Sequence, residues 1–480
     1  MTTVAEPRRA ETIGSWADEA DVLVVGLGCA GACAAVEARE AGADVLVLEA
    51  ASTGGGTSAQ SGGLIYLGGG TPVQRACGYE DTPDDMFAFL MAACGPGPDE
   101  AKVRVFCDES VAHFHWLEAH GVPFKRSFHP EPGMEAPTDD CLVFSGGEDA
   151  HPFLDVARPA PRAHKPRTPG AAGGFLMQRL DAAVVASGAR RRCDAAAHAL
   201  VVDDDGRVVG VVVASDGEER ALRARRGVVL AAGGFVLNDD MVARHCPLLA
   251  RCNLKLSAGR DDGSGILLGQ SVGGDIIRMD GAECAIPLTP PRRLVRGVIV
   301  DDRGQRFINE DTYYGRIGQE ALFHRDARFW WIHDEGTYEV NAVGMQAQAV
   351  ADTIEELEAE IGLPEGALVA TLAVYDRHAR SGRDPVCHKG PAFLEALDRP
   401  PFGAIRVTPK HAIFAGFTLG GLHTRPDAEV LTPQGDPVPG LYAAGRSTSG
   451  IAAPGYASGL SLGDASFFGR RAGRSAARAG

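Results

Sequence analysis

The stretch Asp21-Val22-Leu23-Val24-Val25-Gly26-Leu27-Gly28-Cys29-Ala30-Gly31 is an apolar run that ends directly in closely spaced glycines. Small residues follow, and a second apolar run, Val45-Leu46-Val47-Leu48, ends on Glu49. This order predicts a β-strand, a glycine turn, an α-helix and a second, parallel strand. The pattern indicates a βαβ unit that binds a dinucleotide; the alternative is a glycine turn in an ordinary βαβ unit.

Each glycine of this turn has its own expected role. Gly26 allows the tight turn, Gly28 lets the backbone approach a pyrophosphate, and Gly31 lets the helix pack on the strand. The amino terminus of the helix then faces phosphate charge, to which its free N–H groups are complementary. Glu49 lies where the acid of such a unit accepts a hydrogen bond from a ribose hydroxyl.

The composition is that of an ordinary globular protein, with 480 residues of which 45% are hydrophobic and 23% charged. The net charge of −16 argues against nucleic acid and anionic membranes as main partners. No apolar run reaches the roughly 18–20 residues of a membrane span, and residues 1–19 lack the apolar core of a signal peptide. The 11 cysteines form no CxxC pattern, so we expect no metal site and a reduced, cytoplasmic protein.

Three further segments indicate that the nucleotide-binding part is discontinuous. A loop rich in glycine and hydroxyl groups, residues 52–63, follows the second strand and suits a flat cofactor lying along the backbone. Strands expected at 227–234 and 441–445 both end on glycines and could reach the same cofactor. We therefore expect an α/β protein whose Rossmann-like domain consists of residues 18–275 and 401–480.

Residues 276–400 differ in composition and predict an inserted α+β domain that caps the cofactor and holds the substrate. Within this domain we expect a hairpin around 301–304 and helices at 352–361 and 366–380. In the nucleotide-binding part we expect helices at 83–92, 101–119 and 175–187, strands at 198–202 and 207–214, and a long loop over 129–172.

Four segments together resemble the flavoproteins of the fumarate reductase and 3-ketosteroid dehydrogenase superfamily: 26–31 with Glu49, 54–63, 228–235 and 440–463. The resemblance implies FAD as the cofactor, with the glycine loop along its pyrophosphate and the last helix directed at the flavin. Covalently flavinylated members carry a histidine in that loop, and its absence here implies non-covalent FAD. The residues implied for FAD binding are Gly26, Gly28, Ala30, Gly31, Glu49, Ala50, Thr57, Ser58, Ser61, Gly62, Gly63, Ala232, Gly233, Gly445, Arg446, Ser461 and Leu462.

Two departures from the dicarboxylate-reducing members bear on the substrate. Those members carry a histidine before a Thr-Met-Gly-Gly segment, where this chain has Phe417. They also carry an arginine four residues after the Glu of a Phe-x-Asn-Glu segment, where this chain has Tyr314. Aromatic side chains thus replace both carboxylate-binding groups, which favours an apolar ketone over fumarate.

The segments 61–70 and 455–470 resemble 3-ketosteroid Δ4-(5α)-dehydrogenases, and the Tyr-Pro-Gly-Pro-Gly segment of the Δ1-dehydrogenases is missing. The match implies that Tyr313, Tyr456 and Ser458 line the reacting carbons, with Tyr314 as a rival to Tyr313. Such an enzyme desaturates a 3-oxo-5α-steroid, or a similar polycyclic ketone, at C4–C5, taking a proton beside the ketone and a hydride from the next carbon.

The tyrosines suit this chemistry because a phenol is protonated at neutral pH and can donate to the developing enolate oxygen. Ser458 would relay the proton, yet a free serine is a weak base and its activating partner is not evident. The alternatives are ene-reduction of an enone, Δ1-desaturation, or a non-catalytic flavin protein. The electron acceptor is unknown.

Overall fold

The opening stretch forms the expected βαβ unit in the computed structural model, which describes residues 6–131, 135–215, 217–289 and 291–479. Strand β2 (Asp18–Val25) leads through the glycine turn into α1 (Cys29–Glu40) and then β3 (Val45–Leu48). The two strands are parallel and pair Val22 with Val45. The prediction for this segment is confirmed.

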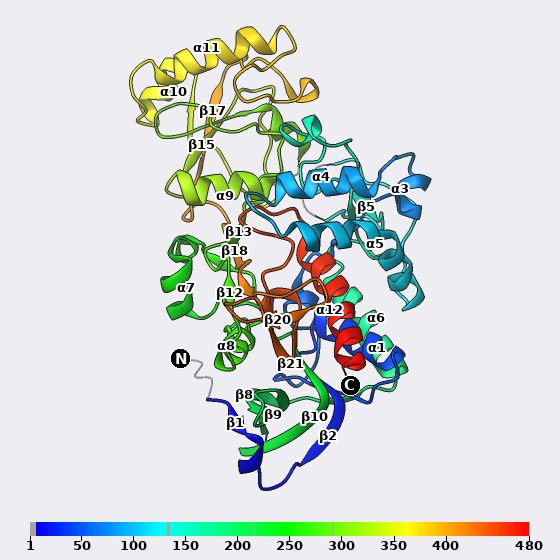
Figure 1. The fold of residues 1–480 in the computed structure, drawn as a ribbon. Coiled ribbons are helices and arrows are strands. Elements are labelled where there is room, and N and C mark those ends of the chain that lie inside the picture. The colour runs from blue at the N-terminus through cyan, green and yellow to red at the C-terminus, as the bar shows by residue number, and fades with distance from the viewer. Residues whose placement is uncertain (1–5, 132–134, 216, 290, 480) are drawn as a thin grey trace.

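The largest sheet joins the two ends of the chain (Figure 1). Its main path has the order β1-β8-β9-β10-β2-β3-β7, and β10 (Glu218–Leu230) also pairs in parallel with β21 (Pro437–Ala443). Its other members are β1 (Arg8–Arg9), β7 (Arg190–Arg192), β8 (Ala196–Val202), β9 (Val208–Ser215) and β20 (Glu429–Leu431). A strand from the last tenth of the chain thus completes a parallel core begun near residue 18, as the sequence predicts.

Helix α12 (Leu460–Arg478) covers this sheet together with α1, and the two helices lie in close contact. A Cβ atom added at Gly469 would lie 2.4 Å from the Ala30 carbonyl oxygen, and one at Gly473 would lie 2.1 Å from that of Ala34. Glycines one helical turn apart therefore let the two backbones meet.

A second body, seen at the top of Figure 1, has a four-stranded sheet of order β14-β15-β17-β16. The strands are β14 (Val298–Val300), β15 (Phe329–His333), β16 (Ala349–Ala351) and β17 (Phe402–Val407), and the expected helices are present as α10 (Ile354–Glu360) and α11 (Ala367–Ala379). Because β17 lies beyond residue 400, this sheet continues past the expected domain boundary. The division of the domains at 276 and 400 stays a prediction. The position of β17 favours a return of the chain to the nucleotide-binding domain after that strand.

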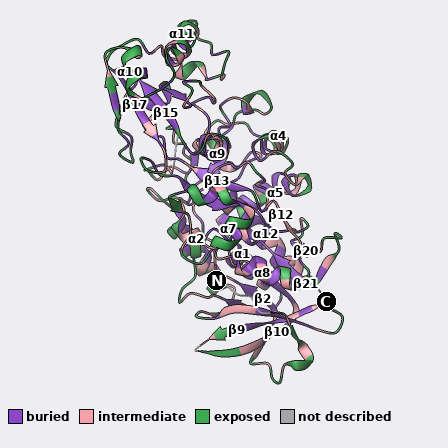
Figure 2. Ribbon diagram, turned by 90° about the vertical axis from the view of Figure 1, so that its left-hand side faces the viewer, coloured by how far each residue is buried: buried purple, intermediate pink, exposed green. Residues whose placement is uncertain are grey.

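Between the two bodies lies a small sheet of order β11-β18-β13, consisting of β11 (Leu254–Lys255), β18 (Ala415–Thr418) and β13 (Ala282–Ala285). Helix α9 (Tyr314–His324) packs on β13. Figure 2 shows this junction largely in the colour of buried residues. Each of these elements contributes residues to the lining of the cavity described in the next subsection.

The remaining elements surround this core. The stretch 129–172, expected to be a loop, contains β5 (Leu142–Val143) and β6 (Ala163–His164), and β6 pairs with both β5 and β4 (Ile65–Tyr66). Residues 132–134 lie outside the described chain. Strands of two residues are too short for a sequence pattern to indicate. The other elements are α2 (Gly56–Gln60), α3 (Pro72–Ala76), α4 (Pro83–Ala93), α5 (Glu100–Ala119), α6 (Gly173–Ala186), α7 (Asp239–His245), α8 (Ser264–Ser271), β12 (Ile276–Ile277) and β19 (Gly421–Leu422). Of the described helices, none is long and apolar enough to cross a membrane.

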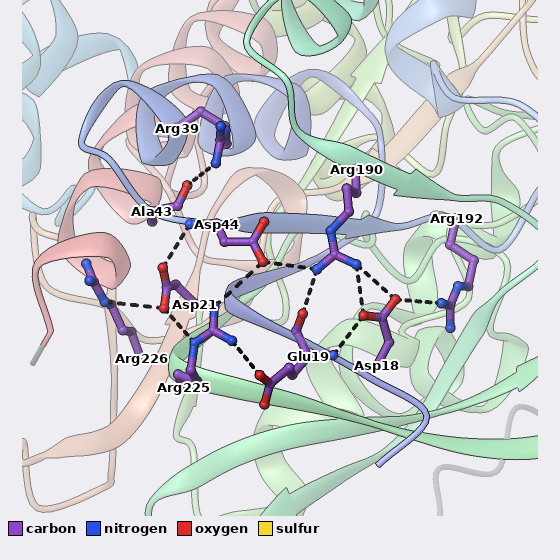
Figure 3. A network of polar contacts seen from close by, with 10 residues as sticks. All are labelled: Asp18, Glu19, Asp21, Arg39, Ala43, Asp44, Arg190, Arg192, Arg225 and Arg226. Atoms are coloured by element: carbon purple, nitrogen blue, oxygen red, sulfur yellow. Dashed lines mark hydrogen bonds and ion pairs between the residues drawn. The ribbon is translucent and has the colours of Figure 1, made fainter.

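The amino ends of the parallel strands carry a network of paired charges (Figure 3). Arg190 and Arg192 both contact Asp18 at 2.8 Å. Arg225 contacts Asp21 at 2.8 Å. The network lies at the opposite end of β2 from the glycine turn.

Candidate active site

A cavity of about 890 Å³ opens at the carboxyl end of β2 and extends to the small sheet of the junction. Ligands of parallel α/β sheets bind at this end of the strands. Of the predicted FAD-binding residues, the cavity is lined by Gly26, Gly28, Ala30, Glu49, Ala50, Thr57, Ser58, Ser61, Gly62, Gly63, Ala232, Gly233, Gly445, Arg446, Ser461 and Leu462.

The glycines of the turn differ in what surrounds them. Gly26 has φ +104°, and an added Cβ would lie 2.4 Å from the Ala231 carbonyl oxygen. Gly31 is not among the lining residues, because its Cβ position lies 1.9 Å from the Gly26 carbonyl oxygen. A Cβ at Gly28 would meet nothing closer than Ser58 Oγ at 3.6 Å, so a side chain there would project into the cavity. This open backbone suits a pyrophosphate.

The Glu49 carboxylate is held by the backbone. Its Oε2 accepts from the Leu27 N–H at 2.8 Å, and its Oε1 accepts from the Ala51 N–H at 2.8 Å. Each carboxylate oxygen can accept a second hydrogen bond, so Glu49 remains free to bind a ribose hydroxyl. Contact with the ribose stays a prediction.

The glycine loop is tied to an aspartate that the sequence analysis did not single out. Thr57 donates to Asp261 Oδ2 at 2.5 Å, and Arg446 pairs with Asp261 Oδ1 at 2.8 Å. Burial alone would raise the pKa of Asp261, but Arg446 and the hydrogen bonds hold it below the ordinary value. Its position in the turn 259–263, between two glycines, is the signal that could have indicated it.

Tyr456 lies in the cavity wall just before α12. Its hydroxyl donates to Ser461 Oγ at 3.1 Å and accepts from the Ser461 N–H at 3.1 Å. Burial raises the pKa of Tyr456 to about 12, although Ser461 partly opposes this. The phenol is therefore neutral at physiological pH and can donate a proton.

Tyr313 and Tyr314 both line the cavity, with ring centroids 4.7 Å apart. Tyr313 donates to Glu283 Oε1 at 2.8 Å. Burial raises the pKa of Tyr314, and hydrogen bonding to Ser458 partly offsets the rise. The two tyrosines are thus both in the cavity but have different partners.

Ser458 is held by its backbone, which donates to the Ser145 carbonyl oxygen at 3.4 Å and accepts from Ser145 Oγ at 2.8 Å. It does not cap α12; the N-cap is Gly459, with φ +98°. The Ser458 side chain is left to face the cavity and Tyr314.

Apolar side chains lie beside these hydroxyls in the cavity wall. Phe417 is directly paired with Glu283 across the small sheet, and its ring centroid lies 5.4 Å from that of Tyr456. The other apolar residues on this side are Leu254, Leu256, Pro287, Val343, Ile413 and Ala415. A flat hydrophobic molecule fits such a wall better than a dicarboxylate does.

The match to known proteins agrees with this geometry. The FAD binding domain family matches residues 21–460. The chain belongs to this family. FAD is therefore its cofactor, and the open glycine backbone, the α1 amino terminus and the hydroxyls of the loop suit that group.

The chain is similar to a crystal structure of 3-ketosteroid-Δ4-(5α)-dehydrogenase from Rhodococcus jostii RHA1 in complex with 4-androstene-3,17-dione. The identity is 48% and the TM-score 0.95, covering 99% of this chain and 100% of that one. It is 28% identical to 3-oxo-5-alpha-steroid 4-dehydrogenase of Comamonas testosteroni, over 90% of this chain and 93% of that protein. A cytochrome-type fumarate reductase of Shewanella frigidimarina is 27% identical, over 96% of this chain and 77% of that protein.

Proposed function

We propose that the protein is an FAD-dependent oxidoreductase that desaturates a 3-oxo-5α-steroid, or a similar polycyclic ketone, at C4–C5. The observation that carries this is one continuous cavity with two kinds of wall. One wall is glycine backbone with short hydroxyls, and the other combines apolar side chains with three tyrosines and Ser458. The similarity to steroid dehydrogenases supports the same substrate class.

The residue roles follow from the hydroxyl groups. Tyr456, neutral and held against Ser461, donates to the ketone oxygen as enolate charge develops. Tyr313 and Ser458 accept and relay the proton that leaves the carbon beside the ketone. Tyr314, which bonds to Ser458, is the rival to Tyr313 for this task.

The predicted FAD-binding residues would hold the cofactor without a covalent bond, since the loop 52–63 contains no histidine. When bound, the flavin supplies the hydride acceptor. The free thiols of all eleven cysteines favour a reducing compartment such as the cytoplasm.

The test is an anaerobic titration of the purified yellow holoenzyme with 5α-androstane-3,17-dione. We expect the visible flavin band to bleach and the product to absorb as a conjugated 4-en-3-one. A product unsaturated at C1–C2 would make the protein a Δ1-dehydrogenase. Reaction only between reduced enzyme and an enone would make it an ene-reductase. A flavin band unchanged by any ketosteroid would refute the proposal.

A further inference from the structure

The wall of the cavity contains a buried carboxyl group that the mechanism above does not use. Glu283, on β13, is 1% exposed and lines the cavity. Its Oε1 accepts from Tyr313 at 2.8 Å, while its Oε2 has no hydrogen-bond partner among the described residues. A buried acid without a cation is costly, so such a group is unusual unless it is protonated or used.

The contact between Glu283 and Tyr313 requires a glycine at position 315. Gly315 lies in the first turn of α9, and an added Cβ would lie 2.0 Å from Glu283 Oε1 and 2.4 Å from the Tyr313 ring. Any larger residue at 315 would displace the carboxyl group or the phenol. The contact between Glu283 and Tyr313 is therefore built into the junction of α9 and β13.

The surroundings leave the carboxyl group able to exchange a proton. Burial raises the pKa of Glu283 to about 8, and the hydrogen bond from Tyr313 only partly opposes the rise. No lysine, arginine or histidine of the described chain pairs with it. The titratable groups around it are Tyr313 and Tyr314 from the start of α9, Tyr456 from before α12, Cys284 of the same strand, and Cys252, whose sulfur lies 3.8 Å from that of Cys284.

The hydrogen bond also restricts what Tyr313 can do. A phenol has one proton, and that of Tyr313 is directed at Glu283. While this bond exists, Tyr313 cannot donate to a ketone oxygen, but its own oxygen has a lone pair free to accept. The Tyr456 hydroxyl contacts Ser461 Oγ, which is itself a hydroxyl and can donate instead of accepting, so the Tyr456 proton can turn to the ketone. A carboxylate can only accept, so Tyr313 is assigned to the opposite task.

We propose that Glu283 is the proton acceptor of the desaturation and acts through Tyr313. This rests on the proposed function. The C4–H bond breaks, and its proton reaches the Tyr313 oxygen directly or through the Ser458 hydroxyl, which passes on its own proton as it takes the new one. The original Tyr313 proton moves to Glu283 Oε1. The C4–H electron pair becomes the new C4–C5 double bond as the C5 hydride leaves for the acceptor that bound FAD would supply, and Glu283 later releases its proton to water.

The test compares Glu283→Gln with the wild-type holoenzyme in anaerobic stopped-flow reduction by 5α-androstane-3,17-dione across neutral and alkaline pH. The wild-type rate should rise with pH and level off above about 8, because Glu283 must be ionised to accept a proton. Glu283→Gln should be about 10²–10⁴-fold slower and lose this rise. Glu283→Asp should recover part of both.

Two further variants separate a proton role from a structural one. Tyr313→Phe should also lose the pH dependence, and the double variant should be no slower than the slower single one, as expected of groups that act as a unit. Asp21→Asn removes the same charge from the far end of the sheet and should react at the wild-type rate.

Three results would overturn the inference. They are a wild-type pH profile retained in Glu283→Gln, a slow Glu283→Gln that Glu283→Asp does not improve, and additive losses in the double variant. If Glu283→Gln binds no flavin, the wild-type profile and Tyr313→Phe decide the matter. A wild-type enzyme that no ketosteroid reduces would instead refute the proposed function.

Discussion

At the amino ends of β2 and β3, Asp18 and Asp21 lie among arginines (Figure 3). Glu283 in the cavity wall, by contrast, has only a phenol as its side-chain partner among the described residues. Burial would raise the pKa of Asp18 and Asp21, yet hydrogen bonds and charge from Arg190 and Arg225 hold it below the ordinary value. Burial without such a partner raises the pKa of Glu283 to about 8.

The two regions show that the partner, and not the carboxyl group, decides what an acid does. A paired carboxylate is ionised at every physiological pH and can only stabilise its neighbours. An unpaired, buried one can take up or release a proton near neutrality, which is a property of groups that serve in proton transfer. The predictions below test this contrast.

Apart from the Glu283 variants, the largest effect is expected for Tyr456, the neutral donor on the cavity side. Tyr456→Phe should retain FAD and lose about 10²–10³-fold in turnover, because it removes one hydrogen bond to the developing oxyanion. Steady-state kinetics with 5α-androstane-3,17-dione measures this. Tyr442→Phe, in a strand outside the cavity lining, should keep normal turnover. Near-normal activity of Tyr456→Phe would remove Tyr456 from this role.

Glu49 is a third kind of acid, held by backbone N–H groups. Glu49→Ala should weaken FAD binding by about ten- to a hundredfold, the range of one to two hydrogen bonds to a charged group. Flavin retained after gel filtration and fluorescence titration of the apoprotein measure it. The FAD affinity of Glu49→Gln should lie between that of Glu49→Ala and that of the wild type. Unchanged flavin content would count against a ribose contact.

Glu283 and Asp21 should make the stability of the folded protein depend on pH with opposite sign. Between its ordinary pKa of 4.5 and about 8, Glu283 holds a proton in the folded protein that the unfolded chain has released, so stability falls as pH rises through this window. Glu283→Gln should therefore gain in Tm over the wild type as pH increases, by several degrees at most. A Tm difference independent of pH would contradict the raised pKa.

The smallest effect is expected in the paired network. The pKa of Asp21 is lowered, so its stabilising contribution is present above the ordinary 3.8 and lost as pH falls further. Arg225, its partner, is 38% exposed, so solvent screening limits the contribution to about 1 kcal/mol or less. Asp21→Asn should lower Tm slightly at neutral pH and not in strong acid. Thermal scans at both pH values measure this. An equal loss of Tm at the two pH values would contradict a contribution from the Asp21–Arg225 pair.

Local segments were predictable from the sequence, whereas contacts between distant segments were not. The order of β2, α1 and β3 follows from a contiguous pattern, and Gly26 needs a positive φ that glycine adopts readily. The match to a known family supplied Tyr456, Ser458 and the loop 54–63, and all of these except Gly55 line the cavity. Whether Tyr313 or Tyr314 enters the cavity had no answer in a linear motif, and the structure brings both there.

By itself, the sequence determined the βαβ unit, the discontinuous sheet and the family, because apolar periodicity, glycine turns and motif spacing act over short distances along the chain. Only the tertiary structure brought Glu283 of β13 against Tyr313 at the start of α9, and Asp261 against Thr57 and Arg446. Those contacts depend on the register of β13 with β18 and on how α9 packs over it. Register and packing are set by long-range burial, which no local pattern encodes.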